Sequence, residues 1–370
     1  MALKSKNFRI KNYSLSVISS ILISLNLLVS PYIQTVFSQS SFSALVSRLD
    51  KNNLVSAEEW RYYDEDNSRT TAIRRSNYLA ADAALIYSKN RDEIIFESNS
   101  DKKIAPASLA KLFVIDYIYS IFDDSELISV DTNILELVPE DSSIANIVPG
   151  NYYVSNLVAG MLVPSGNDAA YALCYAAAQK ISGNSNIAPQ EGLDLFIENL
   201  ATYLKEQGYN DTIISNCSGF SYDDSSSCKD LLKVSKKLLE NSYIRKVIQS
   251  PTYSSTNADG VRFEWVNTNR ALQENSVFYD KRIKGFKTGS LNEIYNLISV
   301  LETADDEYIL IELAAKDNIR RYYSNVYLMK QIGLDLSAEA AGVSLTPEEI
   351  EAERQAEEHD KLDALLPEIK

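Results

Sequence analysis

A serine and a lysine three residues apart, Ser108 and Lys111, could supply a nucleophile and its base. They stand in the stretch Pro-Ala-Ser-Leu-Ala-Lys, which an apolar run typical of a helix follows. Residues three apart lie on one face of a helix, so these two side chains would be neighbours. Backbone N–H groups at a helix start lack partners and favour developing negative charge. The pattern indicates a serine nucleophile with a lysine base. Taken alone, it also describes an N-cap serine followed by a surface lysine.

The histidine content restricts this chemistry further. The 370 residues include one histidine, His359, which stands in a charged C-terminal segment. A Ser-His-Asp triad or a histidine-rich zinc site therefore cannot be built in the main body of the chain. A nucleophilic serine there must use another base, and lysine is the natural candidate. We expect no metal ion and no cofactor.

Two further polar motifs follow in order. Residues 165–167 read Ser-Gly-Asn, and residues 287–289 read Lys-Thr-Gly. Each motif alone is an ordinary turn, cap or strand end, but the ordered set S-x-x-K, S-x-N, K-T-G is found in penicillin-binding proteins and class A β-lactamases. The chain resembles the serine D-alanyl-D-alanine carboxypeptidases, which are the low-molecular-weight penicillin-binding proteins.

The resemblance covers roughly residues 76 to 335. Residues 83–97 look like the strand pair before the family's nucleophile, and residues 157–163 look like its lead-in to S-x-N. Residues 216–220, Asn-Cys-Ser-Gly-Phe, are similar to the family's N-P-H-G-L turn, although Cys217 and Ser218 replace proline and histidine. Ser290 follows K-T-G, where relatives often have histidine.

The resemblance implies a catalytic role for four residues. Ser108 would form an acyl-enzyme, with Lys111 as its base. For this, burial and a nearby second lysine would have to lower the pKa of Lys111. Ser165 would relay a proton to the leaving amine. Asn167 would bond the substrate's backbone amide and help to position Lys111.

The K-T-G strand would bind the substrate. Lys287 would hold the S-x-N serine and make the pocket electropositive, and Thr288 would bind the substrate's terminal carboxylate. Gly289 would let the strand approach the substrate closely. The backbone N–H groups of Ser108 and Ser290 would form the oxyanion hole.

A further substrate contact is implied outside the three motifs. Arg321 opens the expected last helix, at a place where the resemblance puts a carboxylate-binding arginine. Arg320 is adjacent and is the alternative for this role. An arginine on an exposed helix surface is the ordinary interpretation of either residue.

The implied activity is removal of the terminal D-alanine from peptidoglycan stem pentapeptides, with β-lactam antibiotics as inhibitors. A serine β-lactamase would need a glutamate for its deacylating water. Glu206 and Asn210 have an E-x-x-x-N spacing, but the expected proline and leucine between them are missing. A wall-binding module without turnover is the other alternative, and the presence of every motif residue argues against it.

These residues need secondary structure to position them. Hydrophobic patterns predict strands over about 81–88 and 93–98, a series of helices from Ser108 to about 240, then further strands and a last helix. The expected helices cover about 153–163, 167–179, 192–206, 229–240 and 318–332, and the later strands cover 261–266, 294–301 and 308–315. The first and last strands can share one sheet. The resemblance implies an α+β fold, with an antiparallel sheet flanked by helices, an inserted all-helical lobe, and the site in the cleft between them.

The two ends of the chain differ from this body. Residues 1–40 combine a basic start with an uncharged run and have no acidic residue, which indicates a signal peptide or a signal anchor. We favour cleavage, and expect export across the cytoplasmic membrane and membrane contact only through this segment if it is retained. Residues 41–75 read as a polar connecting segment, 76–335 as the catalytic domain, and 336–370 as a solvated acidic tail.

The net charge bears on the class of partner, and the cysteines bear on disulfide formation. The net charge is −15, which argues against nucleic-acid binding. Cys217 and Cys228 bracket a polar loop and either form a disulfide in an exported protein or remain unpaired. Cys174 stands in an alanine-rich run and reads as a small buried apolar residue.

Overall fold

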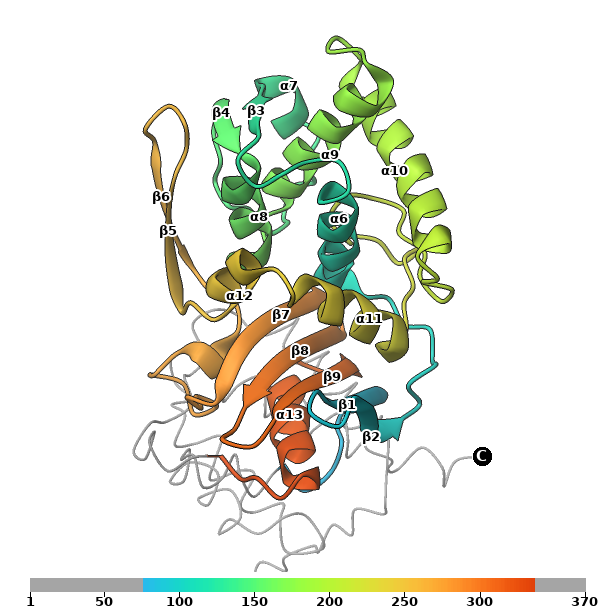
Figure 1. The fold of residues 1–370 in the computed structure, drawn as a ribbon, viewed down its shortest axis with the longest axis vertical. Helices are drawn as coiled ribbons and strands as arrows, with labels where there is room; N and C mark the ends of the chain where they lie inside the picture. Colours follow the sequence, from blue (N-terminus) through green and yellow to red (C-terminus); the bar gives the residue numbers. More distant parts are fainter. Residues whose placement is uncertain (1–75, 337–370) are drawn as a thin grey trace, which may run out of the picture. The chain divides into compact units, whose positions relative to one another are not determined.

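The computed structural model describes residues 76–336 (Figure 1). The predicted export segment, the connecting segment and nearly all of the acidic tail lie outside the described residues. The main sheet has five antiparallel strands in the order β2-β1-β9-β8-β7, so the strands from both ends of the described chain share it, as predicted. These strands are β1 (Ala83–Ser88), β2 (Glu93–Ser98), β7 (Ile283–Leu291), β8 (Ile294–Glu302) and β9 (Glu307–Ala315).

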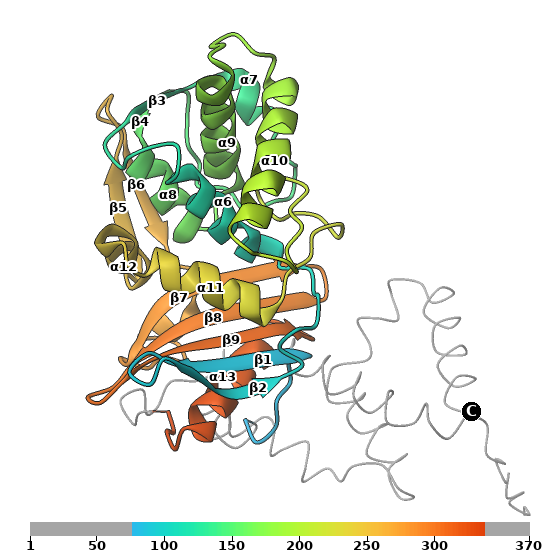
Figure 2. The same ribbon diagram turned by 45° about the vertical axis from the view of Figure 1, so that its right-hand side comes forward.

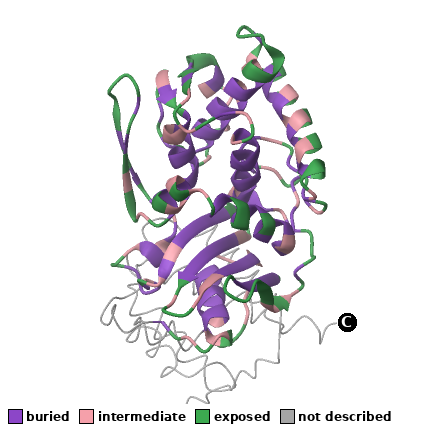
Figure 3. Ribbon diagram, in the orientation of Figure 1, coloured by how far each residue is buried: buried purple, intermediate pink, exposed green. Residues whose placement is uncertain are grey.

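Helices cover both faces of this sheet, which is why its inner strands are buried along their length (Figure 3). Alternate residues of β1 belong to two different cores: Leu85 packs on one side and Ile86 on the other. On one face α11 (Cys228–Leu238) packs on β1 and β9, and on the other α13 (Arg320–Gln331) packs on β8 and β9. Together with the structural relatives described below, this arrangement confirms the predicted α+β fold.

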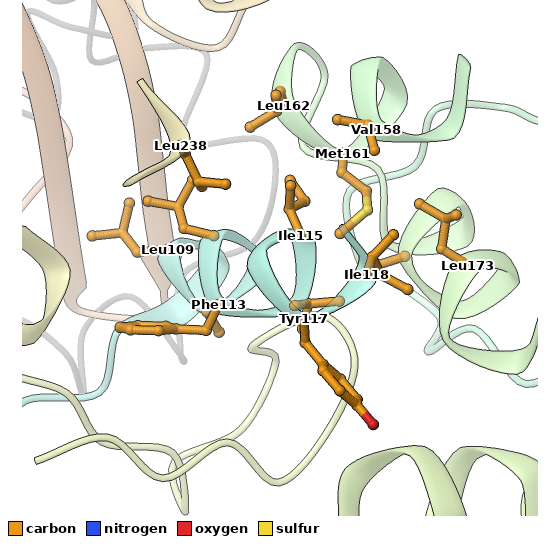
Figure 4. Close-up of a cluster of buried hydrophobic side chains, with 14 of the residues drawn as sticks. Leu109, Phe113, Ile115, Tyr117, Ile118, Val158, Met161, Leu162, Leu173 and Leu238 are labelled. Atoms are coloured by element: carbon orange, nitrogen blue, oxygen red, sulfur yellow. The ribbon is translucent and has the colours of Figure 1, made fainter. Parts of the chain in front are cut away.

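The lobe inserted between β2 and β7 is mainly helical (Figure 2). Its central helix is α6 (Ala110–Ile118), in which every residue is buried. Around α6, Met161 and Leu162 of α8, Leu173 of α9 and Leu238 of α11 close the apolar core (Figure 4). The remaining helices are the 3-10 turn η1 (Ala107–Leu109), α7 (Thr132–Leu135), α8 (Val154–Leu162), α9 (Asn167–Ser182), α10 (Pro189–Glu206), α12 (Ser242–Ile248) and the 3-10 turn η2 (Arg270–Leu272).

Two short hairpins differ from the sequence prediction. The polar stretch before α8 contains a hairpin of β3 (Leu127–Val130) and β4 (Gly150–Tyr153). The strand predicted over 261–266 does not join the main sheet, because β6 (Arg262–Val266) pairs only with β5 (Thr252–Thr256) in a separate hairpin. Alternate residues of β6 are exposed, as expected for a strand with one face in solvent.

The three cysteines are all free and buried. Of the two possibilities for Cys217 and Cys228, the structure therefore has the unpaired one. The burial predicted for Cys174 is confirmed. No helix within residues 76–336 is both long and apolar enough to cross a membrane.

Candidate active site

Ser108 lies in η1, the single 3-10 turn that leads directly into α6. The preceding residue, Ala107, has a φ of 49°, a left-handed conformation that costs free energy for a residue other than glycine. Asn296 of β8 holds this turn, since its Nδ2 donates to the carbonyls of Ala105 at 3.0 Å and Pro106 at 2.9 Å. The sheet thus fixes the backbone that presents the serine.

Two glycines let backbone segments pack directly against the turn of Ser108. A Cβ on Gly289 would lie 2.6 Å from the carbonyl oxygen of Pro106. A Cβ on Gly219, whose φ is +80°, would lie 2.0 Å from the carbonyl oxygen of Ala107. Close approach of the substrate to Gly289 stays a prediction, and the contact that requires glycine in the structure is with the turn of Ser108.

Lys111 is fully buried and reaches the serine from the next turn. Its Nζ donates to Ser108 Oγ at 3.0 Å, to Asn167 Oδ1 at 2.7 Å and to the carbonyl of Ser218 at 2.8 Å. All three acceptors are uncharged. Burial lowers the pKa of Lys111 from 10.5 to about 7, against the opposing charge of Asp168. The neutral amine is therefore well populated near neutral pH.

Lys287 approaches the S-x-N loop from the opposite side. Its Nζ donates to Ser165 Oγ at 2.8 Å and to the carbonyl of Thr288 at 3.0 Å. Burial, together with the nearby charges of Lys111 and Arg321, lowers the pKa of Lys287 well below its usual value. The lowering predicted for the pKa of Lys111 is thus present with burial as its main cause, and the repulsion between the two lysines contributes to the lowered pKa of Lys287.

The S-x-N loop itself is held by an aspartate that sequence reasoning did not single out. Asp168 is buried, and its carboxylate accepts from the backbone N–H groups of Ala145 at 2.7 Å, Ile147 at 3.0 Å and Ala169 at 2.9 Å. This negative charge stands in the first turn of α9, where a helix favours it. It anchors the loop on which Asn167 faces Lys111.

The substrate-binding candidates gather along β7. Thr288 Oγ1 lies 2.7 Å from Thr268 Oγ1, so Thr268 joins the group. Arg321 Nη1 donates to Ser290 Oγ at 3.0 Å, and its Nη2 to Asn318 Oδ1. Arg321 thus contacts the K-T-G strand, and at 5% exposure it is not a surface residue.

Some residues that sequence reasoning missed have a recognisable signal in the amino-acid sequence, and others have none. Asp168 directly follows the S-x-N motif, and Asn296 is a polar residue in a largely apolar strand, which is a usable signal. Thr268 has no comparable signal, since only the fold brings it to Thr288. Glu206, considered for a β-lactamase, is exposed at the end of α10 and makes none of the contacts of Ser108 or Lys111.

The part of the chain that the structure describes contains no group of three or more His, Cys, Asp or Glu side chains placed to hold a metal ion. The arrangement can instead perform acyl transfer. It combines a hydroxyl nucleophile, a buried amine within hydrogen-bonding distance, a second serine held by a second lysine, and an arginine on the adjoining strand.

Comparison with known proteins places these features in a family. A family described as D-alanyl-D-alanine carboxypeptidase (peptidase S11) matches residues 69–316. The D-alanyl-D-alanine carboxypeptidase DacF of Bacillus subtilis is 26% identical over 261 residues, which cover 69% of this chain and 58% of DacF. The chain thus matches little more than half the length of this curated relative.

Solved structures agree on the fold. The Streptomyces K15 DD-transpeptidase has a TM-score of 0.60 at 22% identity, covering 70% of this chain and 99% of its own. Penicillin-binding protein D2 of Listeria monocytogenes, in the ampicillin-bound form, has a TM-score of 0.53 at 25% identity, covering 68% and 97%.

Proposed function

The chain belongs to the D-alanyl-D-alanine carboxypeptidase family, and from that membership we propose that it is a serine D-Ala-D-Ala carboxypeptidase acting on peptidoglycan stem pentapeptides. The observation that supports this best is the environment of Lys111. A fully buried amine with three uncharged acceptors, one of them Ser108 Oγ, is suited to take the serine's proton.

Acylation would proceed in two linked proton transfers. Ser108 Oγ attacks the carbonyl carbon of the penultimate D-alanine while its proton passes to neutral Lys111. The oxyanion is bound by the backbone N–H groups of Ser108 and Ser290. The C–N bond then breaks, and the departing D-alanine amine takes a proton through Ser165, whose hydroxyl accepts a hydrogen bond from Lys287. Water afterwards hydrolyses the ester on Ser108, which restores the enzyme.

The substrate would bind along β7, the strand that contains the K-T-G motif. Thr288 and Arg321 are proposed to hold the terminal carboxylate, with Thr268 supporting Thr288 through its hydroxyl. Arg321 is already hydrogen-bonded to Ser290, so a carboxylate there would meet an arginine of fixed orientation. Asn167 would bond the substrate amide while holding Lys111 through its Oδ1.

Two measurements test this function. Incubation with a labelled penicillin should modify Ser108, and Ser108→Ala should remove the label. Mass spectrometry of a pentapeptide muropeptide should show loss of one D-alanine. Penicillin turnover without D-alanine release would identify a β-lactamase, and penicillin binding with neither reaction would identify a wall-binding module.

We further propose that the catalytic domain acts outside the cytoplasmic membrane, facing the cell wall, where stem peptides are found. This rests on the family and on the predicted export segment. A protease added to intact wall-less cells should digest the domain. Complete protection under conditions in which a known exported protein is cleaved would contradict this location.

A further inference from the structure

A carboxyl group, that of Glu312 in β9, is buried between the main sheet and α13. Glu312 is 0% exposed and lies opposite Ala84 of β1 and Leu297 of β8, which belong to the apolar core under α13. Neither of its carboxyl oxygens has a hydrogen-bond partner within residues 76–336. A buried polar group without a partner costs free energy that an apolar residue would not cost. The glutamate therefore indicates a role other than packing.

Arg321 is the charged group that faces Glu312. α13 places Arg321 and Asn325 four residues apart, on one face of the helix. Asn325 Nδ2 donates to Ser299 Oγ of β8 at 3.0 Å, so this face lies against the sheet. Both Asn325 and the charge of Arg321 favour the ionised form of Glu312. The Cys228 thiol of α11 also interacts with Glu312, but burial raises its pKa and keeps it neutral.

Burial opposes the ionised form of Glu312 and is the stronger influence. It raises the pKa of Glu312 well above the usual value, against the effects of Asn325 and Arg321. At neutral pH the carboxyl group therefore keeps its proton and has no charge. A neutral acid leaves the positive charge of Arg321 uncompensated.

The guanidinium group of Arg321 has only uncharged partners among the residues that the structure describes. They are the Gly289 carbonyl at 3.4 Å, Ser290 Oγ at 3.0 Å, Asn318 Oδ1, and the rings of Tyr295 and Tyr322, whose centroids lie at 5.7 and 5.3 Å. The charge of Arg321 reaches the candidate active site, because it helps to lower the pKa of Lys287. A buried guanidinium without an anion beside it favours the binding of one from outside.

Under the proposed function, on which this inference rests, that anion is the terminal carboxylate of the stem peptide. We propose that Glu312 is a proton-linked positioning residue, which keeps its proton while a carboxylate is bound to Arg321 and weakens that binding when the proton is lost. Because Glu312 is fully buried, it acts on the substrate only through Arg321. The coupling is reciprocal, so the bound carboxylate must strengthen the hold of Glu312 on its proton by the same factor.

The pH dependence of binding tests this link. The full-length Ser108→Ala chain is titrated by calorimetry with a diacetylated lysyl-D-Ala-D-Ala peptide between pH 5 and 9. Since Lys111 and Lys287 also have lowered pKa values, the comparison is with the same chain carrying Glu312→Gln as well. We expect the dissociation constant to rise with pH about three- to tenfold more in the chain that retains Glu312.

Two controls locate the effect. The same peptide with an amidated C-terminus has no carboxylate, so its binding should depend on pH equally in both chains. Glu198→Gln removes an exposed carboxyl group from α10 and should leave the additional pH dependence in place. A purely structural role of Glu312 would change the melting temperature of Glu312→Gln without producing a pH dependence specific to the carboxylate peptide.

A second measurement does not need a variant at position 312. Carbon-13 NMR of side-chain carboxyl groups in labelled Ser108→Ala should show one glutamate that titrates well above the ordinary range. Saturation with the carboxylate peptide should raise its midpoint by about 0.5–1 pH unit, which is the same three- to tenfold coupling. The amidated peptide should leave the midpoint in place.

The outcomes separate this role from the proposed activity. A midpoint that the carboxylate peptide does not raise, or equal pH dependence with and without Glu312, would overturn the role of Glu312. Release of D-alanine by the unmodified chain would then leave the carboxypeptidase function standing. The coupling without release of D-alanine would support the role and overturn that function. An equal effect with the amidated peptide would overturn the link to the carboxylate.

Discussion

At the scale of single residues, the proposed chemistry rests on Lys111, whose burial favours the neutral amine that a base requires. A pKa lowered from 10.5 to about 7 corresponds to a destabilisation of the ammonium form by on the order of 5 kcal/mol. Hydrogen bonds to uncharged acceptors hold the amine in place without restoring that charge. At neutral pH the lysine is therefore both ordered and able to accept a proton.

The first prediction is that Lys111→Arg loses acylation. Arginine keeps the positive charge but does not deprotonate at working pH, so the rate of benzylpenicillin acylation should fall by about a thousandfold or more. In the wild type this rate should rise with pH through about 7, because only the neutral amine accepts the proton. Stopped-flow acylation between pH 5 and 9 measures both effects.

The thermal stability of Lys111→Arg serves as the control, since a variant that unfolds says nothing about proton transfer. A folded Lys111→Arg protein that acylates at close to the wild-type rate would limit the lysine to an electrostatic role. Another base, such as a water held by Ser165, would then be required.

The second prediction concerns Asp168, whose charge raises the pKa of Lys111. Asp168→Asn removes that charge, so the lysine should lose its proton at lower pH. The midpoint of the acylation profile should move to lower pH by up to about one unit. Stability should fall by about 1–3 kcal/mol, because an amide cannot accept all three backbone N–H groups.

Glu198→Gln, an exposed change of the same charge, is the control for Asp168→Asn and should leave the pH midpoint in place. A midpoint that stays unchanged or rises in Asp168→Asn would show that Asp168 supports the loop without acting on the lysine.

At the scale of elements, the contact between β7 and the turn of Ser108 decides whether the nucleophile is correctly placed. The third prediction is that Gly289→Ala displaces this turn, because the added methyl would lie 2.6 Å from the Pro106 carbonyl oxygen. A shift of about 1 Å should slow acylation about a hundredfold. The acylation rate and the melting temperature are measured together.

Gly183→Ala separates this clash from the general cost of replacing glycine. Gly183 has a φ of 64° at the end of α9, and a methyl there meets nothing within 4 Å. It should lose some stability and keep its acylation rate. If Gly289→Ala acylates as fast as Gly183→Ala, the turn is not positioned by its contact with β7.

The elements with strong hydrophobic periodicity were predicted from the sequence to within a few residues. The helices from α8 to α11 and the strands β8 and β9 belong to this group. The nucleophile's helix differs, since α6 begins at Ala110 and Ser108 lies in a 3-10 turn before it. Sequence reading also missed β3 and β4, because a strand of four residues is too short for its alternation to be recognised in the sequence.

The site was predictable to the extent that its residues form local motifs. Ser108, Lys111, Ser165, Asn167 and Lys287 meet as their order in the chain suggested. The supporting residues Thr268 and Asn296 act on partners far away in sequence, so their positions depend on how the sheet and the lobe assemble. Local spacing contains no information about such contacts.

At the scale of the described domain, the candidate active site depends on segments that are far apart within residues 76–336. β1 lies near the start of the described residues and β9 near their end. The two strands pair with each other, and the helical lobe is inserted between them in the sequence. One apolar core includes residues of β1, α6, α9, α11 and β9. Buried Asp116 of α6 binds Tyr203 at 3.1 Å, Tyr209 at 2.9 Å and Lys237 at 2.8 Å, which joins α6 to α10 and α11.

The fourth prediction is that the active site and the fold are lost together. Because Lys111, Ser165 and Lys287 stand on segments that share this core, we expect the site to open only when the core unpacks. Penicillin labelling of Ser108 and far-UV circular dichroism should therefore fall at the same urea concentration. Brief labelling pulses at each urea concentration keep acylation from stabilising the fold. Labelling lost at clearly lower urea than the helical signal would mean that the strand β7 or the S-x-N loop separates first, and that the lobe is a cooperative unit of its own.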